Sequence, residues 1–150
     1  MSVFLLDVNV LVALLDPAHP NHEDAHGWFG AHGRRGWATC PLTIAGCVRV
    51  LSNPAYPTVN ATPADVIDRL RIFCGSSHHE FWPDAISLLD ERLFRPGMLQ
   101  GHRQITDVCL LALAIRNKAK LATFDTTIPL KAVRGGALGD VMLLGSSGAS

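Results

Sequence analysis

Three aspartates stand where a parallel sheet would bring carboxylates together. Asp7 directly follows an apolar run over 3–6, Asp125 directly follows an expected strand over 121–124, and Asp107 stands at the start of an expected helix. Ligands of open parallel sheets bind beyond the carboxyl ends of the strands, near the point where the strand order reverses. We therefore expect the three side chains to converge at one edge of such a sheet.

Converging carboxylates favour a hard divalent cation. Close carboxylates repel one another and cannot all stay ionised at neutral pH unless a cation offsets them, and Mg²⁺ or Mn²⁺ is the natural occupant. Such a cation polarises a phosphate oxygen and activates water for in-line attack, so the chemistry indicated is metal-assisted phosphoryl transfer. Structural roles stay open for Asp125 in a turn and Asp107 as a helix cap, whereas an acid between apolar stretches, as Asp7 is, needs a reason to be buried.

Alternating strands and helices are expected to position these acids, and the alternation predicts a parallel sheet covered on both faces. The pattern places strands over 3–6, 36–40, 80–82, 121–124 and 140–144. Helices are expected over 8–15, from an Asn21 cap to Gly33, from a Thr43 cap to Leu51, from a Thr62 cap to Phe73, over 86–94, and from Thr106-Asp107 to Ile115. A single domain over 1–145 and a flexible tail over 146–150 follow.

Composition excludes some classes of protein. The 150 residues carry zero formal net charge, which argues against nucleic-acid binding by bulk electrostatics and leaves local basic patches. Only 17% of residues are charged and 48% are hydrophobic, so we expect an interface with a partner or a second copy. The four cysteines form no CxxC pair and predict reduced thiols. Without a signal peptide or a membrane-spanning run, the chain is expected to be cytoplasmic, with no membrane contact.

The acidic stretches carry a resemblance to a known family. They are similar to the first, third and fourth acidic motifs of PIN-domain ribonucleases, and in particular of VapC toxins from toxin–antitoxin pairs. Two further stretches match a VapC subgroup in order and spacing, so that the resemblance covers nearly the whole chain. The matching stretches are 5–9 (LLDVN), 105–107 (ITD) leading into 110–114 (LLALA), 121–125 (LATFD), 37–43 (WATCPLT) and 46–54 (GCVRVLSNP).

The resemblance implies a three-layer α/β/α sandwich with a central, mostly parallel sheet. It implies a Mg²⁺- or Mn²⁺-dependent endoribonuclease that cleaves structured RNA such as tRNA or rRNA, forms a homodimer and is inhibited by a small cognate antitoxin. Asp7, Asp107 and Asp125 would bind the metal and carry catalysis. Asn9 and Thr106 would orient the acids, although both could simply cap helices.

One position departs from the pattern of that subgroup. The subgroup usually has a glutamate directly after the threonine as its second acidic motif, and here Ile44 follows Thr43. An isoleucine cannot ligate a metal, so the alternative is a catalytically weakened PIN domain that binds antitoxin or RNA. If the site is otherwise intact, Ile44→Glu is expected to tighten metal binding and raise cleavage.

Two other enzyme classes compete for parts of the sequence. His22-Glu23-Asp24-Ala25-His26 spells HExxH, the motif of zinc metalloproteases, but no third ligand stands at a characteristic downstream spacing, and a solvated helix face is the simpler interpretation. Asp7 also resembles the nucleophile of haloacid dehalogenase-like phosphatases. Those enzymes need a second aspartate two residues later, where this chain has Asn9.

Basic residues are the candidates for holding RNA phosphates. Arg49 lies on the helix after Thr43, and His102 and Arg103 directly precede Thr106-Asp107. Phosphate contacts position a nucleic acid without reading its sequence, so these three residues are predicted to bind substrate without selecting it.

Overall fold

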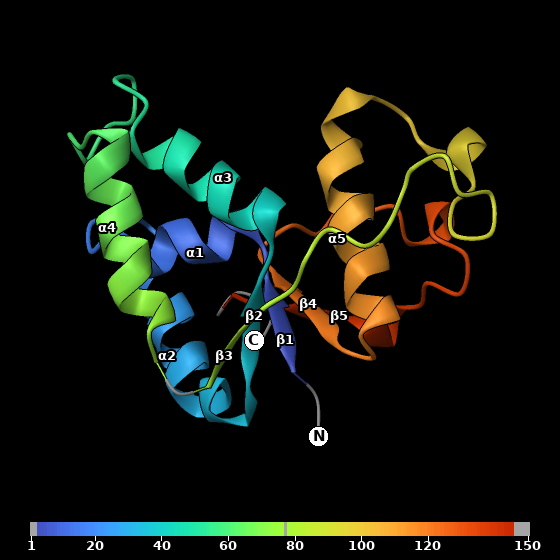
Figure 1. Ribbon diagram of the computed structural model, residues 1–150, viewed down its shortest axis with the longest axis horizontal. Helices are drawn as coiled ribbons and strands as arrows, with labels where there is room; N and C mark the ends of the chain where they lie inside the picture. Colours follow the sequence, from blue (N-terminus) through green and yellow to red (C-terminus); the bar gives the residue numbers. More distant parts are fainter. Residues whose placement is uncertain (1–2, 77, 146–150) are drawn as a thin grey trace.

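A five-stranded parallel sheet forms the centre of the molecule. The computed structural model describes residues 3–76 and 78–145, so the tail expected over 146–150 lies outside the described residues. Every neighbouring pair of strands is parallel, in the order β3-β2-β1-β4-β5 (Figure 1). The strands are β1 (Phe4–Leu6), β2 (Trp37–Thr39), β3 (His79–Phe81), β4 (Lys120–Thr123) and β5 (Val141–Leu143). The strand order reverses at β1, which lies between β2 and β4.

Helices cover both faces of this sheet. The helices are α1 (Val8–Leu15), α2 (His22–His32), α3 (Pro41–Leu51), α4 (Pro63–Cys74) and α5 (Ile105–Arg116). In Figure 1, α1 to α4 lie on one side of the strands, and α5 lies on the other side with the yellow segment that precedes it. This is the expected three-layer α/β/α sandwich.

The sheet separates two hydrophobic clusters. Along β1, Phe4 and Leu6 join the cluster formed with α1 to α4, while Leu5 joins the cluster formed with α5. Successive side chains of a strand point to opposite faces, so a continuous apolar run is needed when both faces are covered. The apolar runs therefore predicted the central strands, and all five expected strands are present with ends that differ by at most one residue.

The helix expected over 86–94 is wrong. This segment consists of turns, because Ser87 and Asp90 hydrogen-bond to nearby backbone N–H groups and so compete with a helix. Its end is also paired elsewhere: Phe94 forms an antiparallel bridge with Val133, and the Arg95 N–H donates to the Ala132 carbonyl at 2.8 Å. Tertiary pairing thus outweighs the local apolar spacing.

Two helix starts also differ from expectation. Thr43 is not the N-cap of α3: the cap is Cys40, Pro41 is the first helical residue, and the Thr43 hydroxyl accepts from the Cys40 N–H at 2.9 Å. Thr106 and Asp107 do not cap α5, because Gln104 is its N-cap and Asp107 lies in its first turn. Asn21 does precede α2, but its side chain makes no capping bond.

Two predictions about the whole chain can be compared with the structure. Cys40, Cys47, Cys74 and Cys109 are all free thiols, as expected. Within residues 3–76 and 78–145, no helix combines the length and the apolar character needed to cross a membrane.

Candidate active site

Asp7 is fixed at the junction of β1 and α1. It is the N-cap of α1 and is only 5% exposed. One carboxylate oxygen accepts from the Val8 N–H at 2.7 Å, and the other accepts from the Thr123 hydroxyl at 2.7 Å. Burial raises the pKa of Asp7, the Thr123 and Val8 hydrogen bonds oppose that rise, and the nearby charge of Asp125 adds to it.

Asp107 approaches from α5, on the other side of the sheet. Burial raises its pKa to about 7, and the charges of Asp7 and Asp125 contribute to the rise. An interaction between the Asp107 and Asp125 carboxyl groups also raises the pKa of Asp107. Burial, together with the two acids close by, therefore lets Asp107 keep its proton up to about neutral pH.

Asp125 follows β4 and completes the group. Burial acts to raise its pKa, but hydrogen bonds from the Thr127 hydroxyl and N–H and from Asp107 bring the pKa below its usual value. The Thr127 bonds are 2.7 Å from the hydroxyl and 2.8 Å from the N–H. The pKa shifts of Asp107 and Asp125 therefore run in opposite directions, and Asp107 keeps a proton to higher pH than Asp125 does.

Thr123 connects these acids. Its only signal in the sequence is that it is a polar residue within an expected buried strand. Its hydroxyl donates to Asp7 and accepts from the Asp125 N–H at 3.0 Å and from the Asn9 amide at 3.3 Å. Asn9 in turn accepts from the Phe124 N–H at 3.3 Å. The predicted positioning role of Asn9 is thereby supported by contacts, which run through Thr123 and the backbone after β4.

Asp7 and Asp107 line one cleft of about 350 Å³. Thr106 lines it too, as do two residues that sequence reasoning missed, His19 and Tyr56. The remaining lining residues are Val8, Asn9, Val12 and Val50. His19 follows α1 and Tyr56 follows α3, so neither has a sequence neighbour in an acidic motif.

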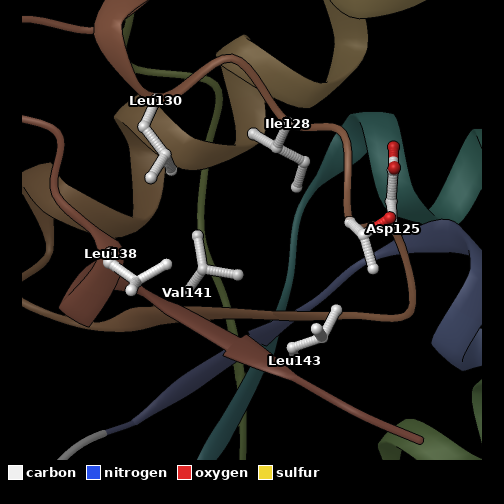
Figure 2. Close-up of a pocket in the computed structure, with 7 residues that line it drawn as sticks. Asp125, Ile128, Leu130, Leu138, Val141 and Leu143 are labelled. Atoms are coloured by element: carbon white, nitrogen blue, oxygen red, sulfur yellow. The ribbon is translucent and has the colours of Figure 1, made fainter. Parts of the chain in front are cut away.

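Asp125 lies at the edge of a second, apolar cavity of about 280 Å³. Figure 2 shows it beside a hollow surrounded by the aliphatic side chains of Ile128, Leu130, Leu138, Val141 and Leu143. Asp125 thus lines this cavity and also lies close enough to Asp7 and Asp107 to raise their pKa values.

The carboxylates fit a divalent cation in their chemistry. Hard cations prefer oxygen ligands, and three neighbouring carboxyl groups supply them. Among the described residues lining the cleft, none is Lys or Arg to offset the acids. Within the described part of the chain, no three or more His, Cys, Asp or Glu side chains already lie together in an arrangement that could hold a metal ion. Because the pKa of Asp107 is raised to about 7, a cation at these acids would compete with the Asp107 proton.

Ile44 lies in a different cavity from these acids. It lines an apolar space of about 260 Å³ with residues of α4 and β3, among them Ile67 and Phe81. It also packs against the hydrophobic cluster on the α1 to α4 side. The expectation that Ile44 stands in the wall of the acidic site is therefore not supported by its position.

The three predicted phosphate-binding residues also lie outside the acidic cleft. Arg49 is exposed on α3, and neither it nor His102 or Arg103 is among the residues that line the cleft. His102 and Arg103 line a separate, shallow depression just before α5.

The HExxH stretch forms no protease site. His22 and His26 lie on α2 with ring centres 4.5 Å apart, and the His22 Nδ1 is hydrogen-bonded to the Ala13 carbonyl at 2.7 Å. A zinc protease needs a third protein ligand, and no such group of ligands occurs in the residues that the structure describes.

Comparisons with known proteins agree with this geometry. The family model for the PIN domain matches residues 4–134. Ribonuclease VapC44 of Mycobacterium tuberculosis (strain H37Rv) is 44% identical over 131 residues, which are 87% of this chain and 92% of VapC44. Ribonuclease VapC39 of the same strain is 42% identical over 124 residues, 83% of this chain and 89% of VapC39.

Solved structures share the fold at low sequence identity. One is Mycobacterium tuberculosis VapC20, described as a sarcin–ricin loop cleaving toxin, with a TM-score of 0.61, 10% identity and coverage of 83% of this chain and 92% of that one. Another is a toxin–antitoxin complex from Klebsiella pneumoniae, with a TM-score of 0.59, 15% identity and coverage of 95% and 96%.

Proposed function

Since this chain belongs to the PIN-domain family, among its VapC ribonucleases, we propose that it is a toxin of a toxin–antitoxin pair that cleaves RNA with a divalent cation. The observation that carries the proposal is that Asp7 and Asp107 line one cleft with Asp125 close enough to raise the pKa of both, because three carboxyl groups with no Lys or Arg among the described residues that line the cleft are suited to a hard cation. The weakened PIN domain is not favoured, since Ile44 does not line this cleft.

Each residue has a distinct task in this proposal. Asp7, Asp107 and Asp125 would hold Mg²⁺ or Mn²⁺, and the bound ion would polarise a phosphate oxygen and lower the pKa of water. Thr123 keeps Asp7 in one orientation by donating to its carboxylate, and Asn9 keeps Thr123 and the backbone after β4 in place. Thr106 contributes a hydroxyl to the wall of the cleft beside Asp107.

The substrate we propose is structured RNA, such as tRNA or rRNA. The description of VapC20 as a sarcin–ricin loop cleaving toxin supports an RNA substrate with folded structure. Zero net charge argues against holding the RNA by bulk electrostatics, so local contacts would have to hold it. Arg49, His102 and Arg103 are exposed and remain our predicted contacts for the RNA phosphates.

A cognate antitoxin is the protein partner we propose, in the cytoplasm. Structural neighbours include toxin–antitoxin complexes. An amphipathic or extended antitoxin segment would cross the acidic cleft and place a basic side chain among the aspartates, where an opposite charge is lacking. The two cavities beside the acids provide apolar surface for the rest of that segment.

Metal-dependent cleavage of RNA tests the proposal. Purified protein is incubated with total tRNA and with ribosomal RNA, in EDTA and with added Mg²⁺ or Mn²⁺. Cleavage is expected only with the metal and is expected to disappear in Asp7→Asn, while Asp68→Asn, an exposed acid on α4, serves as the matched control. Cleavage that continues in EDTA or in folded Asp7→Asn would refute the mechanism.

A further inference from the structure

We propose that His19 donates a hydrogen bond from its Nε2 to an RNA phosphate in the acidic cleft. The inference rests on the proposed function and adds a substrate-binding residue that none of the acidic motifs contains. His19 lines the same cleft as Asp7 and Asp107, in the segment between α1 and α2.

The protonation of the His19 ring follows from a backbone contact. The Asn21 N–H lies 3.0 Å from the His19 Nδ1. A backbone N–H can only donate, so Nδ1 must act as the acceptor and carries no proton in this arrangement. The ring proton is then on Nε2, on the opposite side of the imidazole from the loop. His19 therefore presents a donor, which is the group that a phosphate oxygen requires.

Asp16 holds the loop that carries His19. The buried Asp16 carboxylate accepts from the Ala18 N–H at 2.9 Å and from the Tyr56 hydroxyl at 2.6 Å, and it also accepts from the Thr58 hydroxyl. The His19 N–H donates to the Asp16 carbonyl at 3.0 Å. These bonds connect the end of α1 to the segment after α3, so His19 is presented by an anchored loop.

The composition of the cleft explains why a donor is needed there. A phosphate that approaches Asp7 and Asp107 meets negative charge, and among the described lining residues none is Lys or Arg. The Tyr56 hydroxyl proton is already directed to Asp16 and one N–H of the Asn9 amide donates to Thr123, so the second Asn9 N–H, the Thr106 hydroxyl and His19 are the neutral side-chain donors that remain among the lining residues. A neutral histidine that lines this space supplies an N–H donor from Nε2 while Nδ1 keeps its bond to the loop, which suits an anionic substrate.

Two substitutions separate the donor role from the loop role. His19→Asn keeps a short acceptor for the Asn21 N–H, as asparagine commonly does two residues before a backbone donor, but has no group that reaches the position of Nε2. His19→Gln places an amide N–H₂ near the position of Nε2 and loses the short acceptor. His19→Ala removes both functions.

Two measurements are made: the kinetics of RNA cleavage by the metal-loaded protein, and the affinity for RNA under conditions without cleavage. KM and kcat are measured on the RNA that the wild-type protein cleaves, and the Kd of a fluorescein-labelled fragment of that RNA is measured by anisotropy in EDTA. A hydrogen bond to a charged group corresponds to about tenfold or more in affinity. We expect His19→Asn and His19→Ala to raise KM and Kd about tenfold with little change in kcat, and His19→Gln to stay within about threefold of wild type.

Three results would overturn the inference. His19→Asn resembling wild type while His19→Gln is impaired would show that the loop bond alone matters. Equal losses in His19→Asn and His19→Gln, or no loss in either, would show that a donor at Nε2 does not bind RNA. Absence of metal-dependent cleavage by the wild-type protein is a separate result, and it would refute the proposed function itself.

Discussion

Thr123 fixes the geometry of the acids through a single hydroxyl group. The hydroxyl donates to the buried Asp7 carboxylate and accepts from the Asp125 N–H and the Asn9 amide. A hydroxyl has one donor and two acceptor sites, so these three contacts satisfy it completely. Removing the hydroxyl would leave one carboxylate oxygen of the buried Asp7, the Asp125 N–H and the Asn9 amide without this hydrogen-bond partner.

We expect Thr123→Val to reduce both stability and activity. The shape is nearly unchanged, but a buried acceptor loses its partner, which costs about 1–3 kcal/mol in the free energy of unfolding. RNA cleavage should fall at least about tenfold, because positioning partners of metal ligands affect activity by that factor or more. Chemical denaturation and cleavage assays check both effects. Thr123→Ser keeps the hydroxyl and should lie close to wild type, and a serine variant as impaired as the valine variant would contradict this role.

Ile44→Glu now has a different expected result from the one suggested by the sequence. Ile44 lines an apolar cavity with Ile67 and Phe81 and does not line the cleft of Asp7 and Asp107. Ile44 is partly buried, so a carboxylate placed there loses part of its hydration, and Arg71, which also lines the cavity, offsets its charge only in part; the free energy of unfolding should fall by about 1 kcal/mol. Mn²⁺ affinity, measured by calorimetry, should not improve. Tighter Mn²⁺ binding by Ile44→Glu than by the uncharged Ile44→Gln would show that this position does reach the metal.

Sequence reasoning pointed to the three acids and to Asn9 and Thr106 beside them, but not to Thr123, His19 or Tyr56. Asp7 and Asp125 were recognisable because each follows an expected strand, and such strands end at one edge of a parallel sheet. The importance of Thr123 depends on a contact with Asp7 across 116 positions, which no local pattern records. The buried Asp16 holds the loop of His19 and accepts a hydrogen bond from the Tyr56 hydroxyl. Tyr56 and Thr58, which donate to its side chain, also lie far from it in the sequence.

At the scale of elements, α1 and α3 approach closely at Gly46. A Cβ at this position would lie 2.5 Å from a methyl group of Val8, the first residue of α1. The absence of a side chain therefore permits the contact between the two helices. Since the Val8 N–H also donates to Asp7, the packing of α1 against α3 is coupled to the position of the acid.

We expect Gly46→Ala to destabilise the protein and lower its activity. Alanine normally favours a helix over glycine by about 1 kcal/mol, but here the clash with Val8 forces a shift that costs roughly 1–3 kcal/mol. The displaced α1 would move Asp7 and reduce cleavage. Gly27→Ala on α2 is the control, because a Cβ there meets no heavy atom within 4 Å and should stabilise the helix. Denaturation midpoints that rise equally in both variants would contradict the close approach.

The elements show where sequence patterns succeed and fail. Buried strands were predictable because both of their faces are covered, and the α4 start was predictable because Thr62 caps it and Pro63 follows. The segment over 86–94 has helix-like apolar spacing, yet its end pairs with residues 132–134. That pairing is a property of the assembled fold, and propensity alone does not contain it.

At the scale of the whole molecule, the strand order brings the acids together. β1 and β4 are neighbours, so Asp7 and Asp125 leave the same edge of the sheet, and α5 places Asp107 beside them. Several large apolar side chains remain exposed, including Leu89 at 90% and Ile72 at 81%. These exposed apolar side chains and the low charge content support the homodimer that the resemblance to VapC toxins implies. Sedimentation should give twice the mass of one chain at micromolar concentration, and a monomer without antitoxin would contradict it.

Calorimetric titration with Mn²⁺ tests the central claim most directly, because it asks whether Asp7, Asp107 and Asp125 hold a divalent cation without depending on any RNA. The wild-type protein and the Asp68→Asn control should bind Mn²⁺ with the same affinity. Asp7→Asn and Asp107→Asn should each bind about tenfold more weakly or worse, because each loses a charged oxygen ligand while remaining folded. Equal Mn²⁺ affinity in all four proteins would contradict the account, since the cation would then be held by other residues or not bound by this site.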